Sequence, residues 1–219
     1  MAFPPLPAMT FAQLTDYLHG EMVVNALSSD ARLIRRCNEA GAATLKMAFA
    51  LSQALPLSLR APVTVGPAMG AEVSGTAAAM LLWYDKVAAG RDWDHKGRLK
   101  PNNAWIDDGA RSFRFDIWSN LHYGFVGRAV AFSAWTLRSG AGAAQVKDKT
   151  VPDGYWDRRF KKVGDVDVFS AFDDPDDQAA IMIGADLYDA KGPVVTVAEL
   201  RAMVRARAST LATKPAKTP

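Results

Sequence analysis

The sequence has few residues of the kinds that build disulfides and metal sites. It contains one cysteine, Cys37, and three histidines among 219 residues. Because a lone cysteine excludes an internal disulfide, we expect folding in a reducing compartment, with Cys37 as a small buried apolar group. The sequence also has no HExxH, no CxxC and no histidine-rich tract, which argues against a zinc site. We therefore expect no metal and no cofactor.

Several other common signatures are absent. The sequence has no GxxxxGK[ST] phosphate loop and no GxSxG nucleophile elbow. Its longest weakly polar stretch, LKMAFALSQALPLSL, contains Ser, Gln and Pro and is too short to cross a bilayer. The first residues, MAFPPLPAM, have neither a basic n-region nor an apolar core. We expect no membrane span and synthesis in the cytoplasm without a signal peptide.

What is present is an ordinary globular composition with a mild positive charge. Hydrophobic residues make up 49% of the chain and charged residues 22%, and the formal net charge is +3. A chain of this length buries roughly 70% of its unfolded surface, so it can fold as one domain without cross-links. The charge alone does not distinguish a nucleic-acid partner from an anionic cell wall.

Hydrophobic periodicity predicts a mainly helical chain. Apolar residues spaced three and four apart indicate an amphipathic helix over residues 11–27, and Thr10 with Gln13 forms a capping box at its start. A further helix is expected from Ser29, with helical sequence continuing through residues 42–55 to Pro56, and others over residues 71–90 and 125–138, after Asp174, and after Thr196.

Between these helices the pattern changes. Three prolines predict a loop over residues 56–70, and the alternating sequence RSFRFD predicts a short strand over residues 111–116. The sequence GAGAAQ at 140–145 predicts a turn. The expected fold class is mainly α (α+β). It comprises an N-terminal arm over 1–9, a single helical domain over 10–212 with a short central β-hairpin or strand, and a disordered tail over 213–219.

One segment combines side chains that suit a site. The sequence FDIWSNLHYGFVG at 115–127 places an acid, an amide, an imidazole and a phenol within eight positions, followed by two glycines. Upstream, Asp94 and Lys96 flank His95, and such charges can set the pKa of a neighbouring group. Asp116 and His122 form a second acid–imidazole pair if the chain folds back. The alternative interpretation is that these are hydrogen-bonded structural pairs.

Two other features have both a structural and a functional interpretation. The six tryptophans all lie between residues 83 and 156, where they suit either a core or stacking on sugars or bases. Asp174, Pro175, Asp176 and Asp177 suit the start of a helix, as N-cap, N1 and acids in the first turn. We favour capping for this acidic run and leave a catalytic or metal role open.

Five ordered segments carry a family resemblance over about residues 11–190. They are EMVVNALSS (21–29), WDHK (93–96), DIWSNLHYGFVG (116–127), GAGAAQ (140–145) and FDDPDDQAAIMIGADLY (172–188). Together they resemble the type 44 polymorphic toxin domain, whose pattern is roughly W-D-x-K, D-x-W-S-N-x-H-Y-G-Y-V-G, G-A-G-x-x-Q and D-D-P-x-D-Q. The departures, at Leu121, Phe125 and Val130, remove no polar site residue.

The resemblance implies a toxin delivered against rival bacteria. It also implies export by a specialised apparatus such as a type VI secretion system, with a spike or adaptor protein and a cognate immunity protein as partners. The target compartment that we expect is the periplasm.

Three functions remain open at this point. Cleavage of peptidoglycan glycan strands needs two carboxyl groups, for which Glu21, Asp94 and Asp116 are candidates. A metal-independent ribonuclease would use His95, His122 and Lys96 as base, acid and cation, with Arg128 on the phosphate. A secretion adaptor or binding protein needs neither. We favour peptidoglycan as substrate over RNA, because the centre combines acids with aromatics and has no dense Lys/Arg groove.

These hypotheses define two sets of candidate site residues. The candidate catalytic residues are Glu21, Asp94, His95, Lys96, Asp116 and His122. The candidate substrate-binding residues are Trp93, Trp118, Asn120, Tyr123, Arg128 and Gln145. We expect Asp94, Lys96, Asp116 and His122 to converge on one water-accessible pocket.

Overall fold

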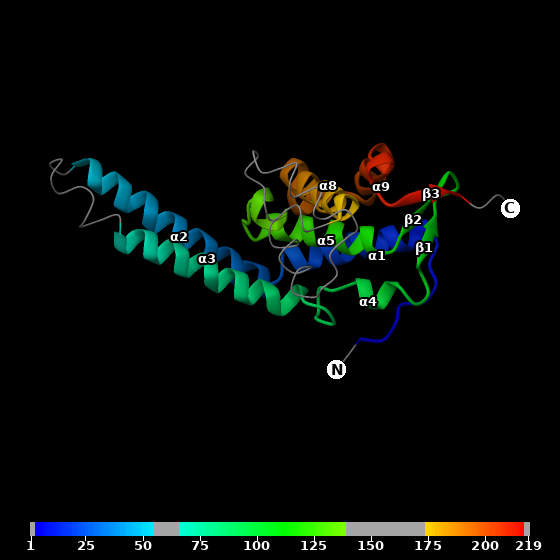
Figure 1. The fold of residues 1–219 in the computed structure, drawn as a ribbon, viewed down its shortest axis with the longest axis horizontal. Coiled ribbons are helices and arrows are strands. Elements are labelled where there is room, and N and C mark those ends of the chain that lie inside the picture. The colour runs from blue at the N-terminus through cyan, green and yellow to red at the C-terminus, as the bar shows by residue number, and fades with distance from the viewer. Residues whose placement is uncertain (1–2, 55–65, 139–173, 217–219) are drawn as a thin grey trace.

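The expected class, mainly α with a small β element, is confirmed. A computed structural model describes residues 3–54, 66–138 and 174–216 (Figure 1). Its helices are α1 (Phe11–Ala26), α2 (Ser29–Ala54), α3 (Gly66–Val87), α4 (Lys96–Leu99), α5 (Asp116–Ala129), α8 (Pro175–Lys191) and α9 (Val197–Ala206), with short 3-10 turns η4 (Gly192–Val194) and η5 (Ala208–Thr210). Its strands are β1 (Trp105–Asp107), β2 (Arg111–Arg114) and β3 (Thr213–Pro215). Among these helices, none is both long and apolar enough to cross a membrane.

The molecule is elongated. Helices α2 and α3 lie side by side as a long pair that extends away from the rest of the chain (Figure 1). At the opposite end lies the three-stranded sheet, and α1, α5, α8 and α9 gather between the two. The body that carries the polar segments is therefore built on α5, which contacts α1 on one side and α8 on another.

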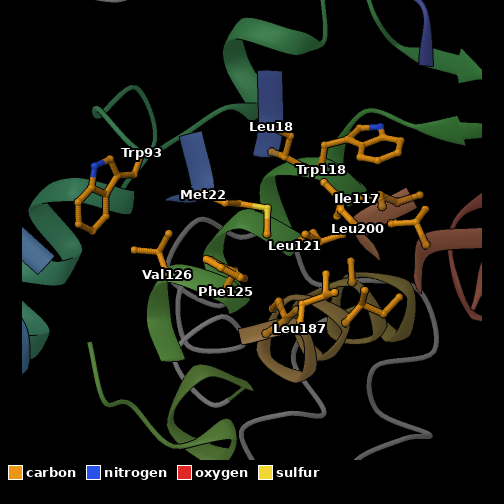
Figure 2. Packing of buried hydrophobic residues seen from close by; sticks show 14 of the residues in the cluster. Leu18, Met22, Trp93, Ile117, Trp118, Leu121, Phe125, Val126, Leu187 and Leu200 are labelled. Atoms are coloured by element: carbon orange, nitrogen blue, oxygen red, sulfur yellow. The ribbon is translucent and has the colours of Figure 1, made fainter. Parts of the chain in front are cut away.

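The core of this body forms where α1 meets α5. Leu14, Leu18 and Met22 of α1 are fully buried at spacings of four, as the periodicity predicted. Figure 2 shows Met22 directed at Leu121 and Phe125 of α5. Fully burying such side chains stabilises the fold by roughly 1.5–3 kcal/mol each.

Helices α5 and α8 pack backbone to backbone at two glycines. A Cβ added at Gly124 would overlap the carbonyl of Ile181, and one added at Gly184 would overlap the carbonyl of Leu121. Further along, Arg128 pairs with Asp189, so residue numbers rise together along the contact. The two helices are thus parallel, and their N-termini lie at the same end.

The sheet is antiparallel in the order β1-β2-β3. Ile106 pairs with Phe113, and both are buried, so they form its inner face. Because side chains alternate along a strand, Trp105, Arg114 and Lys214 lie on the outer face.

The caps expected from the sequence are present. Thr10 and Gln13 exchange both hydrogen bonds of a capping box at α1, and Thr196 and Glu199 do the same at α9. Asp174 accepts a hydrogen bond from the backbone of Asp176, with Pro175 at the first helical position of α8.

The polar segment at 116–124 is helical, whereas we expected a helix to begin only at residue 125. Helix α5 begins at Asp116 and ends at Ala129, and residues 134–138 are helical again after a left-handed Ala131. Two glycines of this helix lie at close contacts: Gly124 packs against α8, and Gly127 packs against the side chain of Leu137.

Other boundaries also differ. Residues 29–54 form one helix that ends near Pro56, as expected, but residues 66–70 belong to α3 where a loop was expected. Thr213–Pro215 form β3 where we expected disorder, because the backbone edge of β2 offers hydrogen bonds to a third strand. Cys37 is half-buried rather than buried. The expected turn at 140–145 lies outside the described residues.

Candidate functional site

Four charged side chains meet where α5 and α8 begin, and we call Lys96, Arg114, Asp116 and Asp177 the charged cluster. The ammonium nitrogen of Lys96 lies 3.5 Å from Oδ2 of Asp177. The Arg114 guanidinium donates to Oδ1 of Asp116 at 2.7 Å and lies 3.7 Å from Oδ1 of Asp177. Arg114 therefore bridges two carboxylates, and Lys96 contacts the more deeply buried of them.

The fold explains why these residues meet. Arg114 ends β2, Asp116 opens α5, and Asp177 lies in the first turn of α8. Because α5 and α8 are parallel, their positive N-terminal ends lie together, and each favours an acid in its first turn. Lys96 comes from the start of α4, in the segment WDHK.

Asp177 has the most unusual environment of the cluster. Its side chain is 10% exposed. Burial raises the pKa of the Asp177 carboxyl, Lys96 and Arg114 oppose the rise, and the charge of Asp116 adds to it. The net direction is upward, so Asp177 holds a proton more readily than an ordinary aspartate. Burial would lower the pKa of Arg114, but Asp116 and Asp177 raise it overall, so the guanidinium stays charged.

A second polar group, the buried histidine network, crosses the interior between α1, the WDHK segment and α5. The Tyr17 hydroxyl lies 2.9 Å from Nδ1 of His95, and the two imidazole rings of His95 and His122 are 4.5 Å apart. Nε2 of His122 lies 3.0 Å from the amide nitrogen of Asn25, and that amide donates to Glu21 at 3.3 Å. Glu21 thus reaches His122 through Asn25.

Both histidines are fully buried and neutral. Burial, followed by the charge of Arg98, lowers the pKa of His95 to about 4. Burial and the neighbouring His95 lower the pKa of His122 well below its ordinary value. Within the described residues, His95 Nε2, His122 Nδ1 and Asn120 Nδ2 have no hydrogen-bond partner. The network joins α1 to α5, with its two imidazoles buried and with Tyr17 and Glu21 partly exposed at its ends.

Of the four residues expected to converge on one pocket, Lys96 and Asp116 belong to the charged cluster, where Lys96 contacts Asp177 and Asp116 contacts Arg114. His122 lies in the buried histidine network instead. Asp94 accepts hydrogen bonds from the backbone of Gly90 and of Lys96, so its carboxylate shapes the loop that presents Lys96.

The expected substrate-binding residues are spread through the body. Trp93 and Trp118 are buried, the first against Trp83 and the second against Phe11. The Tyr123 hydroxyl donates to the carbonyl of Leu137. Asn120 is buried, Arg128 pairs with Asp189 at the surface, and Gln145 lies outside the described residues. The buried tryptophans are core residues here.

Our candidate list omitted two members of the charged cluster, Asp177 and Arg114. The acidic run at the start of α8 serves both interpretations, since Asp174 caps the helix while Asp177 turns inward to Lys96. The signal was present in the D-D-P-x-D-Q segment, whose last acid is Asp177. For Arg114, the sequence indicated only a position in an alternating strand and no role in a site.

Across residues 3–54, 66–138 and 174–216, no group of three or more His, Cys, Asp or Glu side chains has an arrangement that could hold a metal ion. The arrangement can instead hold and release a proton at Asp177, beside a second carboxylate and two cations. Such a combination of side chains suits acid–base chemistry.

Comparison with known proteins identifies a family for the centre of the chain. Residues 82–190 match the family model described as bacterial toxin 44. No curated protein sequence and no solved structure matches the chain. All four residues of the charged cluster lie within the matched range, whereas Tyr17, Glu21 and Asn25 of the buried histidine network lie outside it.

Proposed function

The chain belongs to the bacterial toxin 44 family, and from this premise we propose that it kills rival bacteria by hydrolysing the glycan strands of peptidoglycan. The observation that carries the proposal is the buried Asp177 carboxyl, placed beside Asp116 and between two cations.

Glycan hydrolysis requires two carboxyl groups in different states. One must be protonated, so that it can give its proton to the glycosidic oxygen, and the other must be a carboxylate near the anomeric carbon. The raised pKa of Asp177 suits the proton donor. Asp116, held by Arg114, supplies the carboxylate that stabilises the positive charge developing on the sugar.

The cations complete this assignment. When Asp177 releases its proton it becomes a buried carboxylate, and such a charge is costly without a partner. Lys96, at 3.5 Å, and Arg114, at 3.7 Å, stabilise that form. Lys96 and Arg114 therefore help Asp177 to donate its proton. Arg114, which contacts both acids, also fixes the position of Asp116 relative to Asp177.

The two alternatives are less well supported. Ribonuclease chemistry needs a base and an acid that meet the phosphate, but His95 and His122 are fully buried. An adaptor protein gains nothing from a buried carboxyl with a raised pKa, since such groups cost stability and gather at functional sites.

The family also supports proposals about delivery. We infer that the toxin is exported by a specialised apparatus such as a type VI system, carried by a spike or adaptor protein. It would act in the target periplasm, and the producing cell would be protected by a cognate immunity protein.

The compartment of killing tests this function. We expect the chain to be toxic when a signal peptide directs it to the periplasm and harmless when it stays in the cytoplasm. Asp177→Asn should remove the periplasmic toxicity. Killing from the cytoplasm together with loss of total RNA would contradict the proposal and favour the ribonuclease.

A further inference from the structure

The outer face of the sheet combines an exposed aromatic ring with positive charge directly beside the charged cluster. Trp105 is 42% exposed although most large apolar side chains of the body are buried. The Lys214 ammonium lies 4.0 Å from the centre of its ring. The indole therefore presents an aromatic surface to solvent beside a positive charge, a pairing that suits stacking on a charged ligand.

The strand register connects this ring to the acids. Trp105 is the cross-strand partner of Arg114, and paired side chains on one face have Cβ atoms about 5 Å apart. Arg114 in turn contacts both Asp116 and Asp177. The Arg114 side chain therefore lies between the Trp105 indole and the two carboxylates that it contacts.

The third strand supplies the charge. Lys214 pairs with Ser112, so it lies on the same face as Trp105 and Arg114. This is the strand that we expected to be disordered, and its place in the sheet is what brings Lys214 over the indole. Lys214 therefore places a positive charge against the ring, while Arg114 on the same face is paired with Asp116 and Asp177 and Asp107 adds an acid two residues from Trp105.

We propose that Trp105 and Lys214 form a binding subsite for an anionic glycan, next to the cleavage position at Asp177. A sugar ring stacks on the exposed indole, and Lys214 binds a carboxylate carried by the glycan or its stem peptide. This subsite deepens the proposed function and rests on it. Trp105 was not among the substrate-binding tryptophans predicted from the sequence. Those tryptophans, Trp93 and Trp118, are buried in the core, whereas Trp105 is exposed.

The test measures binding separately from cleavage. Full-length Asp177→Asn protein is mixed with purified sacculi and sedimented, with and without Trp105→Ala. We expect Trp105→Ala to weaken binding about tenfold, as loss of a stacking contact does. Trp105→Phe should keep most of the binding, and Lys214→Met should lower it several-fold.

The matched control is Trp135, which is 52% exposed and lies in the helical residues 134–138, beyond the end of α5 that is opposite the charged cluster. Trp135→Ala should bind sacculi as the parent does. Equal binding by the Trp105→Ala and Trp135→Ala proteins would overturn the subsite. Trp105-dependent binding of single-stranded RNA without binding of sacculi would also overturn it.

Failure of the proposed function gives a different result. If the unmodified protein releases no fragments from sacculi but binds them through Trp105, the hydrolase assignment fails and the subsite stands. If it releases fragments and Trp105→Ala binds normally, only the subsite fails.

Discussion

At the scale of single residues, burial divides the polar side chains of this protein into two sets. Asp177 is buried beside partners of both signs, and burial raises its pKa above that of an ordinary aspartate. His95 and His122 are buried among Tyr17, Asn25 and each other, which keeps them neutral. The same physical effect therefore suits one residue for chemistry and the other two for joining α1 to α5.

The histidines make stability depend on pH. The pKa of His95 is lowered from 6.5 to about 4, so the unfolded chain binds more protons than the folded chain between these values. The free energy of unfolding should therefore fall as pH drops from 7 to 4, by about 3 kcal/mol from His95 alone. His122 adds in the same direction. Urea denaturation at several pH values measures the slope.

Two variants separate these contributions. His95→Gln should flatten the pH dependence, because it removes a group that protonates on unfolding. Asp177→Asn should steepen it, since the raised pKa of Asp177 lets the folded state bind a proton that the unfolded chain has released. A His95→Gln protein with the slope of the parent would show that His95 is not buried as described.

At the scale of elements, the contact between α5 and α8 sets the geometry of the charged cluster. The two helices touch at Gly124 and Gly184, and this contact fixes how Asp177 lies relative to Asp116. Side chains larger than hydrogen at these glycines would push the helices apart. A change of this kind, far from the acids, should therefore alter both stability and chemistry.

Two glycine substitutions give opposite results. Gly124→Ala places a methyl group on the backbone of Ile181 and should cost about 3 kcal/mol or more. Gly20→Ala, inside α1, meets no atom within 4 Å and should stabilise the protein by roughly 0.5–1 kcal/mol. Thermal or urea unfolding compares them. Equal stability of both variants would contradict the close helix contact.

The sequence predicted local features better than tertiary ones. Capping residues and apolar spacing located α1, α9 and the start of α8, because those signals act within one turn. The predicted start of α5 was wrong. Its polar residues and glycines pack against helices that are distant in sequence, so no local signal marks them as helical. Lys96 and Asp116 of the charged cluster were among the predicted site residues. Asp177 was not, since an acid in the first turn of a helix is already explained by the helix dipole.

At the scale of the whole molecule, the structural unit is larger than the family match. The match ends at residue 190, yet β3 completes the sheet and Arg201 of α9 binds Thr15 of α1. Before residue 82, α1 supplies Leu14, Leu18 and Met22 to the core. The charged cluster thus depends on elements that lie on both sides of the match.

A fragment limited to residues 82–190 should not fold. Losing the burial of Leu14, Leu18 and Met22 removes roughly 5–9 kcal/mol, close to the whole stability of a typical domain. Circular dichroism and limited proteolysis of the fragment and of the full chain measure this. A protease-resistant, helical fragment would show that the outer elements are dispensable.

Fragment release from purified sacculi tests the central claim most directly. Two aspartates provide a matched pair, since Asp177 belongs to the charged cluster and Asp189 pairs with Arg128 on the surface. The unmodified chain and Asp189→Asn should release muropeptides at similar rates, while Asp177→Asn, with unchanged circular dichroism, should be slower by about 100-fold or more. Intact sacculi after incubation with the unmodified chain, or full activity of Asp177→Asn, would contradict the account.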